Sequence, residues 1–338
     1  MQSLATRYRP KTLEEVCSQA SIIKILKKQI QTGQIKNCYL LCGPSGTGKT
    51  SIARILAYLI NEGKGEPIEI DAASNNSVDN VRNLIDQAHE RAIGCKYKIF
   101  IIDESHALTN QAYQAFLKTI EEPPPFTIFI FCTTDPQKMP STIINRVQRF
   151  NLTKIETNII ADRLKYICKN EGIVFSDEAI DFIAKISDGG MRDAIANLEK
   201  VSDYGDVNID NAIECLGSYS YSMFFDLVNS LIDGRDESVL NIVNTVYNKG
   251  SDLKLFVNQF LSFCLDVSKY IIFGNCNLLK IPSTMENDLK NATNIEGAKD
   301  YYMYLVDKLL DLKMMLKNDT NIKDTIEVCL LRICRYIK

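Results

Sequence analysis

CYLLCGPSGTGKTS, residues 38–51, is the stretch that decides the fold of this 338-residue chain. It begins with five apolar residues, Cys38 to Cys42, continues as a glycine-rich loop, and passes into an apolar segment with helical spacing that reaches Ile60. A continuous apolar run followed by a glycine-rich turn and a helix is typical of a strand in a parallel sheet covered by helices. We therefore expect an α/β domain organised around this stretch.

The glycine-rich loop has the spacing of a phosphate-binding P-loop, and it lies between a strand and a helix, as that function requires. Its glycines let backbone N–H groups surround phosphate oxygens, and the helix N-terminus adds the positive end of its dipole. We expect Lys49 to reach the β- and γ-phosphates of ATP and the Thr50 hydroxyl to coordinate Mg²⁺. The residues expected to contact the nucleotide here are Gly43, Pro44, Ser45, Gly46, Thr47, Gly48, Lys49, Thr50 and Ser51.

A second apolar run, Ile99 to Ile102, ends in two acids, Asp103 and Glu104. Parallel sheets bind ligands at the carboxyl ends of their strands, so we expect Asp103 to hold the Mg²⁺ and Glu104 to deprotonate the attacking water. Residues 103–106 also spell the DExH tetrapeptide of helicases, but such a helicase has a second α/β domain, which the pattern after Leu152 does not predict. We therefore interpret His106 as a packing or hydrogen-bonding residue.

Further strands and helices are predicted on both sides of these motifs. The expected strands are residues 38–42, 67–71, 98–103, 127–133 and 147–152. The expected helices between them begin near Gly48, Ser77, Asn110 and Pro140. After Leu152 the apolar residues recur at helical spacing, so we expect only helices there.

The pattern predicts three domains. Residues 1–153 form the α/β domain, and residues 154–207 form a small helical lid that ends in a polar segment, Ser202 to Asn208. Residues 208–338 contain longer helices, such as 253–273 and 301–316. The apolar faces of these helices need partners, either one another or neighbouring subunits.

Composition limits the class of protein. With 46% hydrophobic residues the chain is not disordered, and a net charge of −3 excludes coating of nucleic acid through bulk positive charge. Its 11 cysteines lack paired C-x-x-C spacing, so we expect reduced core residues. The N-terminus is polar, and no apolar run approaches the roughly 18 residues of a membrane span. We therefore expect a cytoplasmic protein with no membrane contact.

Several further motifs follow one another in a recognisable order. They are RYRP at 7–10, EIDAAS at 69–74, Val78 to Arg82, LKTIEEPP at 117–124, TTDPQK at 133–138, GMRDA at 190–194 and CLG at 215–217. Together with the P-loop and the two acids, they resemble the gamma/tau family of bacterial DNA polymerase III clamp-loader subunits, which are AAA+ ATPases. The resemblance implies an α/β P-loop AAA+ domain followed by an all-α lid and an all-α collar.

The resemblance also implies roles for single residues around the nucleotide. Thr134, or its neighbour Thr133, is similar to the sensor 1 residue at the end of the fourth strand. Arg192 resembles the sensor 2 arginine, which the lid brings onto the phosphates in cis, and Arg7 lies in the N-terminal motif expected to bind nucleotide. Arg146 resembles the arginine that completes a neighbouring subunit's site, with Arg149 as the rival candidate.

The family's partners are implied in the same way. ATP binding is expected to open a sliding clamp and to let the subunits grip primer-template DNA, and hydrolysis to release the clamp on DNA. The other clamp-loader subunits are expected to complete a pentameric ring. The positions that match the family's DNA contacts are Arg82, Lys118 and Thr142.

The chain departs from the family pattern at three places. Only residues 61–66 separate the P-loop helix from the next strand, so no zinc module and no zinc are expected. Asn75, Asn76 and Ser77 replace basic residues that touch DNA, which predicts weak contact per subunit. No tau-like C-terminal extension is expected. The compact form fits a phage-encoded or reduced-genome clamp loader, and a phage-encoded one would act in the host cytoplasm.

Two alternatives share the phosphate-binding residues. The first is another AAA+ DNA motor, such as a branch-migration or helicase-loading ATPase. The second is a structural clamp-loader subunit with little turnover, although the presence of Lys49, Thr50, Asp103 and Glu104 argues against it.

Overall fold

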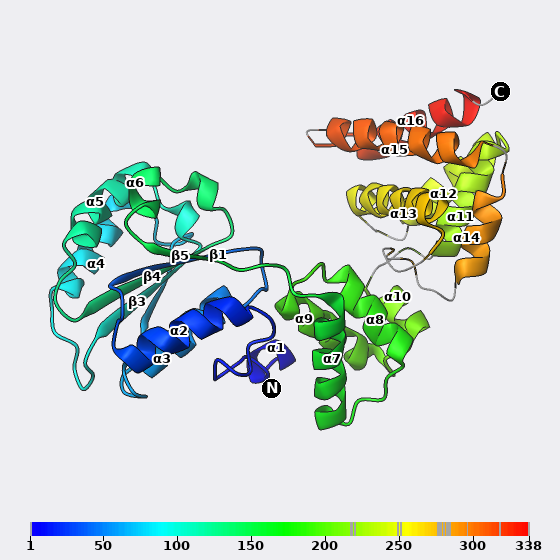
Figure 1. Ribbon diagram of the computed structural model, residues 1–338. Coiled ribbons are helices and arrows are strands. Elements are labelled where there is room, and N and C mark those ends of the chain that lie inside the picture. Colours follow the sequence, from blue (N-terminus) through cyan, green and yellow to red (C-terminus); the bar gives the residue numbers. More distant parts are fainter. Residues whose placement is uncertain are drawn as a thin grey trace. The chain divides into compact units, whose positions relative to one another are not determined.

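A computed structural model describes residues 2–336 apart from 217, 218, 220, 249, 251, 276–278, 280, 282–284, 296 and 318. The chain divides into two compact units (Figure 1). Unit 1 contains Met1–Gly172 and Ile183–Glu199, and unit 2 contains Ile173–Phe182 and Lys200–Lys338. Each unit has its own core and is described separately below.

Unit 1 is built on a parallel sheet of five strands in the order β2-β3-β4-β1-β5. The strands are β1 (Cys38–Cys42), β2 (Ile68–Asp71), β3 (Lys98–Asp103), β4 (Thr127–Thr133) and β5 (Gln148–Asn151). The predicted strands are confirmed, with small shifts at the ends of β2 and β5. The two central strands, β1 and β4, are buried along their whole length, which explains their uninterrupted apolar sequence.

Helices cover both faces of the sheet (Figure 1). One face packs against α2 (Ala20–Thr32) and α3 (Lys49–Ile60), and the other against α4 (Val78–Ala88), α5 (Asn110–Glu121) and α6 (Ser141–Ile144). Successive strand residues alternate between the two cores, so Ile130 lies in the first and Phe131 in the second. This doubly covered parallel sheet confirms the predicted α/β class.

The remaining helices of the N-terminal half are α1 (Leu4–Arg7), α7 (Thr157–Glu171), α8 (Asp177–Ile186) and α9 (Met191–Tyr204). The left-handed Gly172 ends α7. The first three residues of the predicted polar segment Ser202 to Asn208 lie within α9, which continues to Tyr204 with Val201 buried on its inner face. The division between the units passes through α8 and α9, and the boundaries of the predicted lid stay a prediction.

Unit 2 is helical. Its helices include α10 (Ile209–Cys215), α11 (Tyr221–Ile232), α12 (Asp236–Asn248), α13 (Leu253–Phe273), α14 (Glu286–Thr293), α15 (Ala298–Met315) and α16 (Ile322–Tyr336). Within the described part of the chain, the only strand-like feature after β5 is a single bridge between Phe175 and Val207. The predicted switch from an α/β domain to helices is therefore confirmed.

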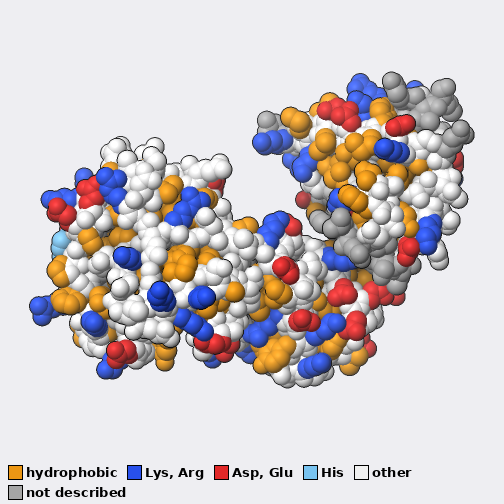
Figure 2. Space-filling model, in the orientation of Figure 1, with side chains coloured by type: hydrophobic (Ala, Val, Ile, Leu, Met, Phe, Trp, Pro, Cys, Tyr) orange, Lys and Arg blue, Asp and Glu red, His pale blue; other side chains and the backbone are white. Residues whose placement is uncertain are grey.

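Helix α13 corrects one expectation from the sequence. Its 21 residues are long and apolar enough to span a membrane by length and composition alone. However, just over half of an 18-residue window of this helix, 56%, is buried within the protein, and the rings of Phe256, Phe260 and Phe263 contact Phe224 in the core of unit 2. The buried apolar side chains of α13 therefore belong to that core. Figure 2 shows basic and acidic side chains interspersed over the visible face, in keeping with the small net charge.

Candidate functional site

The loop between β1 and α3 wraps around its own lysine. Lys49 begins α3, and its Nζ donates hydrogen bonds of 2.9 Å to the backbone carbonyls of Gly43 and Pro44. Only 7% of Lys49 is exposed, and this burial lowers the pKa of its ammonium while Glu104 and Asp103 oppose the shift. A buried cation at the N-terminus of a helix is suited to take an anionic oxygen as its partner.

The loop conformation depends on glycine at Gly46 and Gly48. Their φ angles of 71° and 102° lie in the region that other residues rarely adopt. A Cβ at Gly46 would also lie 2.9 Å from the Cα of Gly190, which directly precedes α9. The backbone N–H of Met191 donates to the carbonyl of Gly46 at 3.0 Å, so the start of α9 docks on the loop.

Thr50 and Asp103 form the pair expected for a magnesium ion. The Thr50 Oγ1 donates to the Asp103 Oδ2 at 2.8 Å, although β1 and β3 are separated by β4 in the sheet. Both side chains offer hard oxygen atoms, and Mg²⁺ in such sites takes its other ligands from water and phosphate. No cluster of three or more His, Cys, Asp or Glu residues suited to a metal is found among the described residues. The two residues fit a site that a nucleotide would complete.

Glu104 follows Asp103, and its side chain contacts Thr134 at the end of the neighbouring strand β4. Its φ of 46° is unusual for a residue other than glycine, and such strain is often found at functional sites. The Glu104 Oε2 accepts a hydrogen bond from Thr134 Oγ1 at 3.3 Å and lies 3.3 Å from His106 Nδ1. His106 Nδ1 is also 3.1 Å from Thr133 Oγ1. Thr134 therefore contacts the acid directly, and Thr133 contacts it only through the imidazole.

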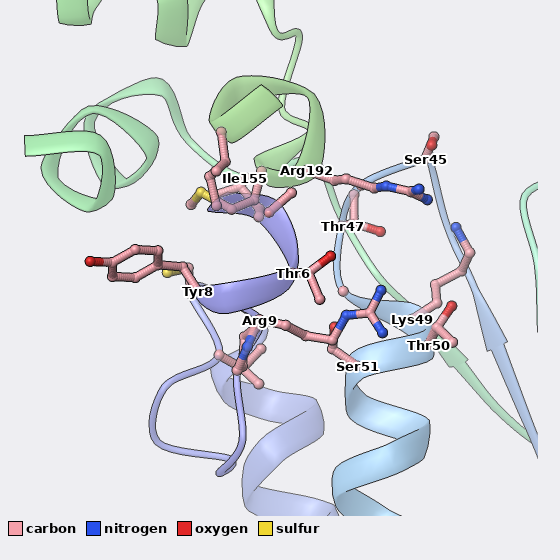
Figure 3. A pocket seen from close by; sticks show the side chains of 18 of the residues that line it. Thr6, Tyr8, Arg9, Ser45, Thr47, Lys49, Thr50, Ser51, Ile155 and Arg192 are labelled. Atoms are coloured by element: carbon pink, nitrogen blue, oxygen red, sulfur yellow. The ribbon is translucent and has the colours of Figure 1, made fainter. Parts of the chain in front are cut away.

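The pocket beside these groups is lined by residues from several segments of unit 1 (Figure 3). The lining includes Ser45, Gly46, Thr47, Gly48, Lys49, Thr50, Ser51, Asp103, Glu104 and Arg192. Thr47 is buried and donates to the Pro44 carbonyl at 2.8 Å. In Figure 3 the Arg192 side chain extends from the lid toward Ser45 and the end of Lys49. The structure thus brings the predicted cis arginine to the P-loop.

The N-terminal motif contributes a different arginine from the one expected. Arg7 is absent from the pocket lining, and its guanidinium pairs with Glu171 of α7 at 2.9 Å. Arg9 lines the pocket instead, and its guanidinium points toward Thr50 and Ser51 (Figure 3). Burial lowers the pKa of Arg9, and the nearby cations Arg54 and Arg192 lower it further. The RYRP motif indicated an arginine here but not which of the two.

Arg146 and Arg149 lie outside this pocket. Arg146 Nε pairs with Glu121 Oε1 at 2.6 Å, and its NH1 donates to the Thr142 carbonyl at 2.7 Å. Arg149 Nε donates to Asn151 Oδ1 at 2.7 Å. Both arginines are exposed, which leaves them available to a neighbouring molecule.

The three residues predicted to contact DNA lie on the helices that cover one face of the sheet. Arg82 is on α4, Lys118 on α5 and Thr142 on α6, and all three are exposed. Arg82 lies 3.5 Å from Asp79, so part of its charge is neutralised locally. A phosphate contact on this face would therefore be modest for one molecule.

Comparison with known families gives three consecutive matches. Residues 60–156 match the family "DNA polymerase III, delta subunit", and residues 159–199 match "DNA polymerase III clamp loader subunit, ATPase lid domain". Residues 207–337 match "DNA polymerase III subunits gamma and tau domain III". The CLG motif at 215–217 falls in this last range, and its glycine lies outside the described residues.

Individual relatives agree with these matches. The DNA polymerase III subunit gamma of Buchnera aphidicola is 30% identical, over 100% of this chain and 99% of the relative. Subunit tau of Bacillus subtilis is 35% identical, over 80% of this chain. The alignments span only about half of the Bacillus subtilis tau and Mycoplasma genitalium gamma/tau subunits, 52% and 53%.

Solved structures agree on the fold. The Thermotoga maritima RuvB Holliday junction branch migration motor superposes with a TM-score of 0.53 at 20% identity. The superposition covers 72% of this chain and 86% of the motor. At this identity the likeness extends to the AAA+ fold and no further.

Proposed function

The chain belongs to the gamma/tau family of DNA polymerase III clamp-loader subunits, and on this premise we propose that it is an ATP-dependent motor subunit of a clamp loader. The observation that carries the proposal is the contact of 2.8 Å between Thr50 and Asp103, with Lys49 and Glu104 beside it. These are the groups that phosphoryl transfer requires of the protein: a cation for the phosphates, two oxygens for Mg²⁺ and a base.

Each side chain has a defined task in the proposed reaction. Lys49 and Arg192 bind the phosphate oxygens, and Thr50 and Asp103 hold the Mg²⁺ that offsets their charge. Glu104 accepts the proton of the attacking water, a contribution that is typically worth about 10²- to 10⁴-fold in rate. Thr134 holds the Glu104 carboxylate from the end of β4, which supports its assignment as sensor 1.

Nucleotide binding is coupled to the lid through the P-loop. The Met191 N–H to Gly46 carbonyl contact joins the start of α9 to the loop, and Arg192 is the next residue along. A ligand shifts such an equilibrium by its differential affinity for the two states. We propose that ATP favours the docked lid and that loss of the γ-phosphate releases it.

The partners follow from the family and remain proposals. The protein would assemble with the other clamp-loader subunits in a pentameric ring, with Arg146 completing the site of a neighbour. ATP binding would open the sliding clamp and engage primer-template DNA through Arg82, Lys118 and Thr142. A ring adds the weak DNA contacts of several subunits, so each Arg82 can contribute although Asp79 partly neutralises its charge. We expect this loading of the clamp onto DNA to take place in the cytoplasm.

Steady-state hydrolysis of Mg·ATP tests the proposal. Glu104→Gln should bind ATP as the wild type does and lose turnover, whereas Lys49→Ala should lose binding. Sliding clamp and primed DNA together should stimulate the wild type more than duplex or junction DNA alone. Unchanged turnover in Glu104→Gln would overturn the assignment of the base. Full stimulation by junction DNA without a clamp would favour a branch-migration motor.

A further inference from the structure

We propose that His106 is a positioning residue that holds the Glu104 carboxylate for proton transfer through its Nδ1. The proposal rests on the proposed ATPase function and concerns the same site. His106 comes from η1 (Ser105–Ala107), the turn that follows β3, whereas Thr133 and Thr134 come from the end of β4. The imidazole therefore links the acid to the neighbouring strand.

The turn that carries His106 is fixed by contacts of its own. The Ser105 side chain is fully buried and donates to the Cys132 carbonyl at 3.0 Å. The Tyr113 hydroxyl of α5 donates to the Ser105 carbonyl at 2.5 Å. Because strand β4 and helix α5 hold Ser105 in this way, the turn does not need the imidazole to keep its shape. The contacts of His106 are then available for a functional task.

The proposed role depends on which ring nitrogen of His106 carries the hydrogen. A carboxylate only accepts, so the Glu104 Oε2 needs a donor, and Nδ1 at 3.3 Å supplies one only when it carries a hydrogen. Thr133 Oγ1 already accepts from the backbone N–H of Asp135 at 3.0 Å and lies 3.1 Å from the same Nδ1. With its hydrogen on Nδ1 the imidazole gives Glu104 a donor, whereas the other tautomer would accept from the Thr133 hydroxyl. The proposed role therefore requires the tautomer with the proton on Nδ1.

This donor has a consequence for the acid. The Glu104 side chain is 42% exposed, and its other contact to β4, from Thr134 Oγ1, is long at 3.3 Å. A half-exposed carboxylate with one weak donor samples several rotamers, and general-base catalysis needs it within reach of the water. Two donors on Oε2 keep the carboxylate in one place and leave Oε1 to accept the proton.

The experiment compares three variants of His106 in the full-length protein under saturating Mg·ATP. Asparagine can place its amide N–H₂ near the position of Nδ1, whereas glutamine places it near Nε2 and alanine removes it. His106→Ala and His106→Gln should lower kcat about 10- to 100-fold, the range expected for loss of a hydrogen bond to a charged group. KM and ATP affinity should not change. His106→Asn should recover most of the loss.

A double-mutant cycle with Glu104→Gln separates positioning from a purely structural role. If His106 acts through Glu104, His106→Ala should lower kcat no further in the Glu104→Gln background. Thermal unfolding of each variant controls for folding, and the Asn/Gln comparison decides the question even if the alanine variant is unstable. Wild-type kcat in His106→Ala, or equal loss in the asparagine and glutamine variants, would overturn the proposal. Full turnover in Glu104→Gln alone would instead overturn the proposed base.

Discussion

Gly46→Ala should uncouple the lid from the P-loop. The added Cβ would lie 2.9 Å from the Gly190 Cα and 3.2 Å from its carbonyl carbon. Both are backbone atoms that cannot rotate away, so the start of α9 has to move. That movement would break the hydrogen bond of 3.0 Å from Met191 N to Gly46 O and withdraw Arg192 from the phosphates.

Three energies are involved, and two of them concern the docked lid. The φ of 71° strains alanine by about 1–2 kcal/mol whether or not the lid is docked, so this term lowers stability alone. The docked state loses a hydrogen bond worth about 1 kcal/mol. It also suffers an overpacking penalty of about 1–3 kcal/mol. Together these penalties disfavour docking by about 30-fold to several hundred-fold.

The assay is kcat/KM for Mg·ATP, with Gly33→Ala as the matched control. Gly33 has a φ of 67°, and nothing lies within 4 Å of an added Cβ there. The control should lose similar stability and keep wild-type kcat/KM, whereas Gly46→Ala should lose at least about 30-fold. In an Arg192→Ala background the further effect of Gly46→Ala should be small. Wild-type kcat/KM in Gly46→Ala would refute the coupling, and a full loss in the Arg192→Ala background would indicate damage to the phosphate cradle instead.

Three further predictions concern the contact between Gln19 and Thr153, the thiols and the trans arginine. The Gln19 amide donates to the Thr153 carbonyl at 2.8 Å and accepts from the Thr153 N–H at 3.2 Å, so Gln19→Ala should destabilise unit 1 by about 2 kcal/mol in urea unfolding. Gln19→Glu, which places a buried carboxylate oxygen against the Thr153 carbonyl, should destabilise unit 1 at least as much. Burial raises the pKa of the Cys38 thiol to about 12, so peptide mapping after iodoacetamide treatment at neutral pH should show Cys95 modified well before Cys38. If Arg146 acts in trans, mixing Lys49→Ala and Arg146→Ala subunits should restore turnover that neither has alone, and subunits with Arg149→Ala alone should keep their activity.

Local patterns predicted most of the sheet and the phosphate loop. The strands could be predicted because a parallel sheet covered on both faces requires continuous apolar runs. The positive φ angles at Gly46 and Gly48 are a local backbone requirement for glycine, which does not depend on residues far along the chain. The contact between Thr50 and Asp103 could also be expected, because the two residues lie at or beyond the ends of strands whose carboxyl ends share one edge of the sheet.

What the sequence could not predict depends on partners far along the chain. The expectation of Arg7 in the pocket fails because the sequence does not reveal Glu171, the acid 164 residues away that takes the Arg7 guanidinium. The role of His106 likewise requires β3 and β4 to be neighbours, which is a property of the strand order. For α13, composition is the same for a membrane helix and a core helix, and only burial separates them.

The contacts of Glu171 explain how the N-terminal motif is held beside the candidate site. Its carboxylate takes both the Arg7 guanidinium at 2.9 Å and the Tyr8 hydroxyl at 2.6 Å, and Arg163 of the same helix donates to the Tyr8 carbonyl at 3.3 Å. The segment is therefore bound to α7, while Arg9, one residue further, faces Thr50 (Figure 3). A nucleotide that contacts Arg9, the P-loop and Arg192 would bridge three segments of unit 1. Because a ligand stabilises the state that binds it, ATP should raise the stability of this arrangement by an amount that grows with the logarithm of its affinity.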